Sequence, residues 1–139
     1  MFMKTNNMIN NFSVVIPVFN EEVIFLNSAK KIYNICLEVG KPFEIIFSEN
    51  GSSDNTVNLI QNFIDDKDSC FMIRTEIANY GLALKNGFKN AKNDLIISFD
   101  ILPSCPTIIS SESTYEAKAA PILKAISGVI DSLNTPLTS

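Results

Sequence analysis

The stretch Phe43-Glu44-Ile45-Ile46-Phe47-Ser48-Glu49-Asn50-Gly51-Ser52-Ser53-Asp54-Asn55-Thr56 decides the fold of this chain of 139 residues. Its first half is an almost continuous apolar run, which suits a strand covered on both faces. In its second half, Gly51 has access to backbone angles that other residues resist. Ser52, Ser53 and Asp54 are residue types that cap helices. We therefore expect a strand, a sharp polar corner and a helix behind it, although an ordinary turn uses the same residue types.

The composition indicates one globular domain and narrows the possible chemistry. Hydrophobic residues make up 46% of the chain, the formal net charge is −4 and histidine is absent. Broad contact with nucleic acid depends on Lys and Arg, so the negative charge argues against it. Without histidine, Ser-His-Asp and Cys-His arrangements are excluded. Acid–base chemistry therefore falls mainly to Asp and Glu.

The cysteines and the N-terminal residues indicate in which cellular compartment the protein is found. Cys36, Cys70 and Cys105 are widely spaced and form no Cys-x-x-Cys pair. We interpret Cys36 and Cys70 as small core residues in a reducing compartment. Residues 1–11 form an extension without the apolar run of a signal peptide, and no segment has the ~20 apolar residues of a membrane span. We expect a cytoplasmic protein, at most associated with the inner face of the membrane.

Further apolar runs predict strands at 12–18, 70–74 and 95–99. Pro17 lacks an N–H group, so regular pairing should be lost there. Asn20 is expected to cap the following helix, with two glutamates in its first turn. Three intervening helices are predicted from apolar residues at helical spacing: Leu26, Ala29, Tyr33 and Cys36 or Leu37, ending at Gly40; Val57, Ile60, Phe63 and Ile64; and Leu84, Phe88 and Ala91.

Strands that alternate with helices predict the α/β class, in three layers with a mostly parallel sheet of about four strands. The carboxyl ends of such strands lie at one edge, where open α/β sheets bind ligands. Residues 17–22, 49–54 and 79–81 and Asp100 all fall at the carboxyl ends of the predicted strands. We expect these polar clusters to converge on one crevice. Beyond it we expect an irregular loop over 101–118, a helix over 119–133 and a tail over 134–139.

The sequence lacks both Gly-x-Gly-x-x-Gly and Gly-x-x-x-x-Gly-Lys-Ser/Thr, so dinucleotide fingerprints and P-loops are excluded. The groups that remain at the predicted edge are carboxylates, amides and hydroxyls. Such groups suit hydrogen bonding to a nucleoside or oxygen ligation of a divalent cation.

Four ordered segments resemble the motifs of family 2 glycosyltransferases, particularly dolichol-phosphate-mannose-synthase-like members. They are Val14-Val15-Ile16-Pro17-Val18-Phe19-Asn20-Glu21-Glu22; Glu49-Asn50-Gly51-Ser52-Ser53-Asp54-Asn55-Thr56; Asn79-Tyr80-Gly81 with Ala83, Gly87 and Ala91; and Asp94-Leu95-Ile96-Ile97-Ser98-Phe99-Asp100. The resemblance implies a GT-A fold with a nucleotide-sugar-binding domain over residues 12–100.

The resemblance also implies roles. Asn50 takes the place of an Asp that hydrogen-bonds the base, and Asp100 matches the first Asp of Asp-x-Asp, near a metal-bound diphosphate. Asp54 is expected to order the corner. The implied donor-site residues are Pro17, Phe19, Asn20, Glu21, Glu49, Asn50, Gly51, Ser52, Asn79, Gly81 and Asp100. The implied partners are a UDP- or GDP-sugar with Mn²⁺ or Mg²⁺, and an acceptor such as a polyprenyl phosphate or a glycan. No catalytic residue is identified.

Two departures keep alternatives open. Asn50 replaces an Asp but still donates and accepts hydrogen bonds. Leu102 replaces the second Asp of Asp-x-Asp and cannot ligate a hard cation. Residues 101–139 resemble no acceptor-binding half. The chain is therefore either part of a transferase or a non-catalytic copy that binds nucleotide or acts as a partner subunit. A flavodoxin-like binding module is a third hypothesis.

Overall fold

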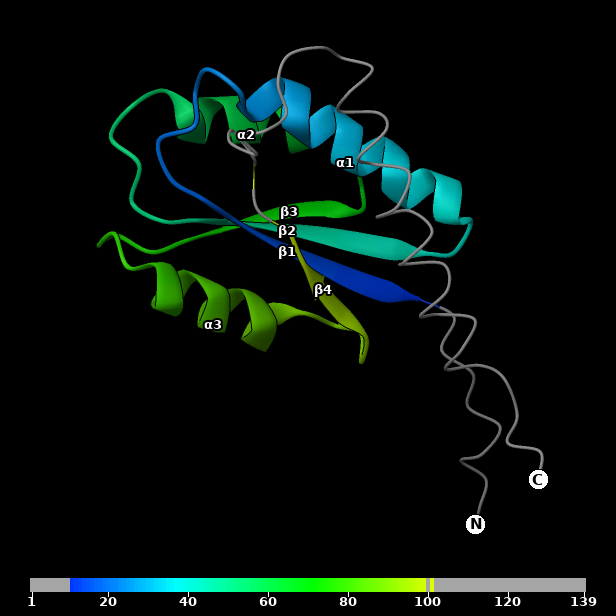
Figure 1. Cartoon of the computed structure of the whole chain (residues 1–139). Helices are drawn as coiled ribbons and strands as arrows, with labels where there is room; N and C mark the ends of the chain where they lie inside the picture. Colours follow the sequence, from blue (N-terminus) through cyan, green and yellow to red (C-terminus); the bar gives the residue numbers. More distant parts are fainter. Residues whose placement is uncertain (1–10, 100, 102–139) are drawn as a thin grey trace, which may run out of the picture.

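The computed structural model describes residues 11–99 and 101 (Figure 1). Four strands alternate with three helices: β1 (Phe12–Val18), α1 (Phe25–Val39), β2 (Phe43–Glu49), α2 (Thr56–Ile64), β3 (Cys70–Arg74), α3 (Tyr80–Asn90) and β4 (Ile96–Ser98). The predicted α/β class is confirmed. The segments expected over 1–10, 102–118, 119–133 and 134–139 lie outside the described residues.

The sheet has the strand order β3-β2-β1-β4, and all three strand pairs are parallel. Helices α1 and α2 cover one face and α3 covers the other (Figure 1). The chain moves outward from β1 through β2 to β3, and β4 then returns to the opposite side of β1. The direction of winding therefore reverses between β1 and β4. Open α/β sheets bind ligands beside such a reversal, at the carboxyl ends of the strands.

Pro17 limits the pairing of β1 on one side only. Pairing with β2 continues through Pro17 as far as Val18 and Glu49, so the expected loss of regular pairing is wrong for that side. Pairing with β4 ends at Val15 and Ser98. The N–H of Ser13 donates to a carbonyl beside β4, and residues two apart in a strand face the same neighbour. The N–H that Pro17 lacks therefore belongs to the β4 side, where pairing stops.

An aromatic cluster holds α1, β2 and α2 together. Phe47 of β2 is fully buried. Its ring centroid lies 5.3 Å from that of Phe25 and 5.9 Å from that of Phe63, in edge-to-face arrangements. Phe25 and Phe63 also meet edge to face, at 6.0 Å. Such pairs stabilise a core beyond the area they bury.

Helix α1 buries only part of the predicted face, since Ala29 and Cys36 are in the core. Leu26 and Leu37 are 42% and 52% exposed, so the prediction is wrong for these two residues. The buried residues are Phe25, Ser28, Ala29, Ile32, Ile35 and Cys36. Gly40 ends the helix as predicted, in the left-handed conformation with φ of 78°.

Helix α3 approaches the opposite face of the sheet through its small residues. Ala83 and Gly87 are its buried positions, and Ser48 Oγ donates to Ala83 O at 2.7 Å. A Cβ at Gly87 would overlap a methyl group of Val15. The predicted face is wrong in this helix, because Phe88 is 43% exposed. Close contact between backbone and sheet replaces the expected packing of large side chains.

We expect Gly87→Ala to lower the free energy of unfolding by about 1 kcal/mol, measured by urea denaturation. Overpacking costs about 1–3 kcal/mol, while exchanging Gly for Ala in a helix gains about 1 kcal/mol. Val15 is fully buried in β1 and has little room to move.

The control is Gly81→Ala in the same helix. A Cβ at Gly81 meets only Asn79 Oδ1, at 3.6 Å, so this variant should keep or gain stability. Equal losses in the two variants would contradict the close-packing role of Gly87.

Candidate functional site

Three loops meet at the carboxyl ends of the strands. They cover residues 19–24 after β1, 50–55 after β2 and 75–79 after β3. The sequence predicted this convergence from the parallel topology, and hydrogen bonds now connect each loop to the next. Asp100 follows β4 but lies outside the described residues.

Asn20 connects the first loop to the second. It is a non-glycine residue with a positive φ, 49°, a region that asparagine tolerates better than most residues. Its Oδ1 accepts from the N–H groups of Ser53 at 2.8 Å and Asp54 at 3.4 Å. Its own N–H donates to Ser52 Oγ at 2.8 Å. The prediction that Asn20 caps α1 is wrong, because α1 starts at Phe25 and Asn20 bonds the neighbouring loop instead.

The two glutamates extend this connection. The N–H of Glu21 donates to Thr56 Oγ1 at 2.9 Å. The N–H of Glu22 donates to Asp54 Oδ2 at 3.3 Å, and Glu22 Oε1 accepts from the N–H of Asn55 at 2.8 Å. We call residues 20–22 and 52–56 the loop clasp. Its hydrogen bonds hold together the two segments that lead into α1 and α2.

Asp54 orders the corner, as predicted. Its Oδ1 accepts from the backbone N–H and the hydroxyl of Thr56. Slight burial acts to raise the pKa of Asp54, but the bonds from Thr56 and from the Glu22 N–H outweigh it and hold the pKa below its usual value of 3.8. The carboxylate is therefore ionised at neutral pH and belongs to the loop clasp.

Glu49 shapes the corner from inside the protein. Its side chain is fully buried. Its Oε2 accepts from the N–H of Ser52, and its Oε1 accepts from Arg74 Nε at 3.2 Å. A buried carboxylate requires such partners. Arg74 was not among the predicted site residues, although its place at the end of β3 was a usable signal.

Asn50 connects the second loop to the third. It is 5% exposed. Its Oδ1 accepts from the N–H of Asn79 at 2.7 Å and from Thr75 Oγ1 at 3.4 Å. Asn79 in turn caps α3, because its side chain accepts from the N–H of Leu82 at 3.0 Å. Thr75 was not among the predicted site residues either.

The other predicted site residues lie at the same edge. Pro17 is buried near the end of β1, and Phe19 beyond it is 41% exposed. Gly51 has a φ of 81° and lies against the backbone of the third loop. Gly81 is exposed in the first turn of α3.

Asp100 is the one metal ligand that the sequence predicts. Within residues 11–99 and 101, no group of three His, Cys, Asp or Glu side chains is placed to hold a metal ion. Both oxygens of Glu49 are engaged by protein donors, so Glu49 does not fit a ligand role. The predicted ligand, Asp100, is outside this part of the chain.

The buried cysteines are inert. Cys36 and Cys70 are free thiols in the core, as predicted. Burial raises the pKa of Cys36 to about 12 and that of Cys70 to about 11. Thiolates are the reactive form of cysteine, so neither residue is a nucleophile at neutral pH.

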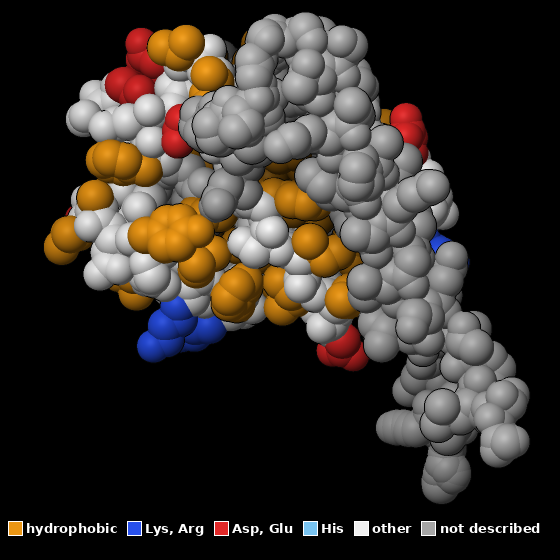
Figure 2. Space-filling model, viewed as in Figure 1, with side chains coloured by type: hydrophobic (Ala, Val, Ile, Leu, Met, Phe, Trp, Pro, Cys, Tyr) orange, Lys and Arg blue, Asp and Glu red, His pale blue; other side chains and the backbone are white. Residues whose placement is uncertain are grey.

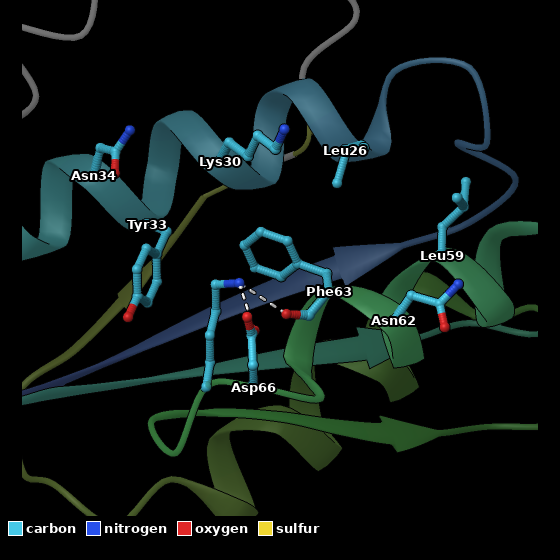
Figure 3. A pocket seen from close by; sticks show the side chains of 9 residues that line it. Leu26, Lys30, Tyr33, Asn34, Leu59, Asn62, Phe63 and Asp66 are labelled. Carbon is cyan, nitrogen blue, oxygen red and sulfur yellow. Dashed lines mark hydrogen bonds and ion pairs between the residues drawn. The ribbon is translucent and has the colours of Figure 1, made fainter.

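A groove of about 530 Å³ lies away from this edge, between the outer sides of α1 and α2 (Figure 3). Lys67 Nζ donates there to Phe63 O at 2.9 Å and to Asp66 Oδ1 at 3.0 Å, and it lies 4.0 Å from the Phe63 ring centroid. These contacts tie the end of α2 to its following turn. None of the predicted site residues lines the groove.

An open parallel sheet with polar loops at its winding reversal defines a class of α/β protein that binds ligands at the carboxyl ends of its strands. The family model described as glycosyl transferase family 2 matches residues 13–100. The chain belongs to this family, and its four-stranded sheet is the Rossmann-like half of the GT-A fold.

Three relatives carry the name undecaprenyl-phosphate 4-deoxy-4-formamido-L-arabinose transferase. The protein of Pectobacterium carotovorum is 36% identical over 94 residues, which cover 66% of this chain and 29% of the relative. That of Pseudomonas aeruginosa is 36% identical over 90 residues, covering 63% and 26%. That of Proteus mirabilis is 33% identical over 100 residues, covering 70% and 31%. The chain thus spans less than a third of the length of these relatives.

Proposed function

We propose that this chain is the donor-binding part of a glycosyltransferase and binds a UDP- or GDP-sugar at the carboxyl edge of its sheet. One observation supports the proposal most directly. Three loops are joined by hydrogen bonds at the carboxyl ends of the strands, next to the point between β1 and β4 where the winding of the sheet reverses. The fixed loops present amides, hydroxyls and an exposed aromatic ring, Phe19. Because the family transfers glycosyl groups, a nucleotide sugar is the ligand that fits this edge best.

Within this proposal, the buried and exposed residues have different tasks. Glu49 and the loop clasp hold the corner in shape, since their side chains bond to backbone N–H groups. Asn50 uses Oδ1 to fix the third loop, and its Nδ2 is the group that we assign to the base. Phe19 and Glu21 line the nucleoside pocket, and Ser52 and Gly81 border it.

Asp100 is the residue that we assign to Mn²⁺ or Mg²⁺. A bound divalent cation would neutralise the diphosphate of the donor. The corresponding second carboxylate is missing, because position 102 is leucine.

The names of the relatives suggest the acceptor. They act on undecaprenyl phosphate, so we propose a polyprenyl phosphate as acceptor and a role in envelope glycan synthesis at the inner face of the membrane. Among the described residues, no helix combines the length and apolar character needed to cross a bilayer. A glycan acceptor is the alternative.

We expect a matching UDP- or GDP-sugar to raise the melting temperature of the chain, measured with and without Mn²⁺. A ligand at a hundred times its Kd stabilises the folded state by about 2.7 kcal/mol. Asn50→Asp should keep the bonds made by Oδ1 but exchange an N–H donor for an acceptor, and so change which nucleoside gives the largest shift.

Asn62→Asp is the matched control. It makes the same chemical change on α2, in the groove away from the edge, and should leave the nucleoside preference unchanged. If no nucleotide sugar shifts the melting temperature of the unaltered chain, the donor-site proposal fails.

The second candidate function is a non-catalytic nucleotide-binding or partner subunit. Leu102 favours it, because leucine cannot complete a metal site. Donor hydrolysis or sugar transfer above background, abolished by Asp100→Ala, would exclude this candidate. Binding without turnover would support it.

A further inference from the structure

We infer that the outer face of α3 docks on an anionic lipid surface. This proposal does not rest on donor binding, because it concerns a different face of the molecule. It depends on a local reversal of charge, on exposed apolar side chains between the charges, and on a hollow beside the helix.

The charge of α3 opposes that of the whole chain. The formal net charge of the protein is −4, yet residues 79–93 contain Lys85, Lys89 and Lys92 and no acidic residue. Glu76 and Asp94 are the nearest acids on either side in the sequence. Basic side chains on one surface helix attract anionic headgroups, each contributing about fivefold in affinity.

Apolar side chains accompany these lysines. Successive residues of a helix are 100° apart, so Leu82, Lys85, Phe88 and Lys89 fall on the side opposite Ala83 and Gly87. Leu82 and Phe88 are 41% and 43% exposed and flank the two lysines. Figure 2 shows hydrophobic side chains beside Lys or Arg side chains on the lower side of the molecule, where α3 lies in Figure 1. Leu82 and Phe88 can enter the membrane interface while the long stems of the lysines carry their charges to the headgroups.

A hollow of about 280 Å³ lies between the C-terminal end of α3 and strands β2 and β3. Phe71 and Ile73 of β3 contribute apolar walls, and Lys92 stands beside them with Nζ 5.0 Å from the Phe71 ring centroid. Glu44 also borders the hollow, but it is 5% exposed and its Oε2 accepts from Ser13 Oγ and the N–H of Lys92. The apolar walls of the hollow would contact the first part of a lipid chain, and Lys92 would contact the anionic headgroup.

A protein partner is the other class of occupant. An apolar protein interface is depleted in lysine at its centre, whereas Lys85 and Lys89 lie at the centre of this face. The arrangement therefore favours lipid headgroups, and the experiment separates the two.

The test is co-sedimentation of the 139-residue chain with vesicles, without nucleotide. We expect binding to phosphatidylcholine vesicles that contain about 30% phosphatidylglycerol, and little binding to pure phosphatidylcholine. Binding should weaken as salt rises from about 0.1 M to about 1 M, because the Debye length falls from about 10 Å to about 3 Å. The pair Lys85→Gln and Lys89→Gln should lower the partition coefficient about 25-fold.

The control pair is Lys30→Gln and Lys41→Gln, which removes the same charge near α1. It should leave partitioning nearly unchanged, and both pairs should melt as the unaltered chain does. Equal losses in the two pairs, equal binding to neutral vesicles, or a chain that stays in the supernatant with every lipid would overturn the proposal. The last result would point to a protein partner. Because no nucleotide is present, each outcome leaves the donor-site proposal to its own test.

Discussion

We expect Phe47→Ala to lower the free energy of unfolding by about 3–5 kcal/mol, the cost of removing a large aromatic side chain from a core. Phe47 is fully buried, and its ring contacts Phe25 of α1 and Phe63 of α2 edge to face. Truncation would leave a cavity where two helices meet the central strand. Domains of this kind are stable by about 5–15 kcal/mol, so a large part of the folded population should be lost in mild denaturant. Urea titration followed by circular dichroism measures the change.

Phe71→Ala is the matched control, since it makes the same truncation in the neighbouring strand. Phe71 is 38% exposed on the face that α3 leaves partly open, so its loss should cost about 1 kcal/mol. Similar costs for the two variants would show that the aromatic cluster is not the centre of the core.

We expect Gly51→Ala to have the second largest effect, about 2–5 kcal/mol. The left-handed conformation costs a residue with a Cβ about 1–2 kcal/mol, and Gly51 has a φ of 81°. A Cβ there would lie 3.1 Å from both the Ala78 N and the Glu76 O. These are backbone atoms, so relief of the contact requires the second and third loops to separate, at a further cost of about 1–3 kcal/mol. The melting shift with nucleotide sugar should be lost as well.

Gly40→Ala separates the two contributions. Gly40 has nearly the same φ, 78°, but nothing lies within 4 Å of its added Cβ. This variant should cost about 1 kcal/mol and keep the ligand-induced melting shift. Equal costs for the two variants, with binding intact in both, would mean that contact between the loops matters little.

The strands were predictable almost to the residue, and the physical reason is their composition. β1, with Phe12 and its valines, and β3, with Cys70 to Arg74, are short apolar runs bounded by polar residues. Their β-branched and aromatic side chains favour strands in any context where both faces are covered. The convergence of the loops followed from parallel topology alone.

The errors arose where distant parts of the chain decide the outcome. Asparagine is a common helix cap, but Asn20 forms its hydrogen bonds with Ser52 and Ser53 in the neighbouring loop instead. Leu84 and Phe88 fall at apolar spacing, yet α3 packs through Gly87. The local sequence does not reveal hydrogen-bond partners more than thirty residues away, such as those of Asn20. It also does not reveal that a helix packs closely through a glycine, as α3 does. The roles of Glu49 and Arg74 required the pairing of β2 with β3.

Strand β2 carries a buried carboxylate near each end, and this fixes its alignment against its neighbours. Glu44 accepts from Ser13 and the Lys92 N–H on the α3 side of the sheet, while Glu49 accepts from Ser52 and Arg74 on the other side. A slip of one residue would exchange the two faces, and a slip of two would separate Glu44 from Ser13 and Glu49 from Arg74. Either error would leave buried carboxyl groups without their partners on the neighbouring strands, so the polar residues of β2 favour a single alignment.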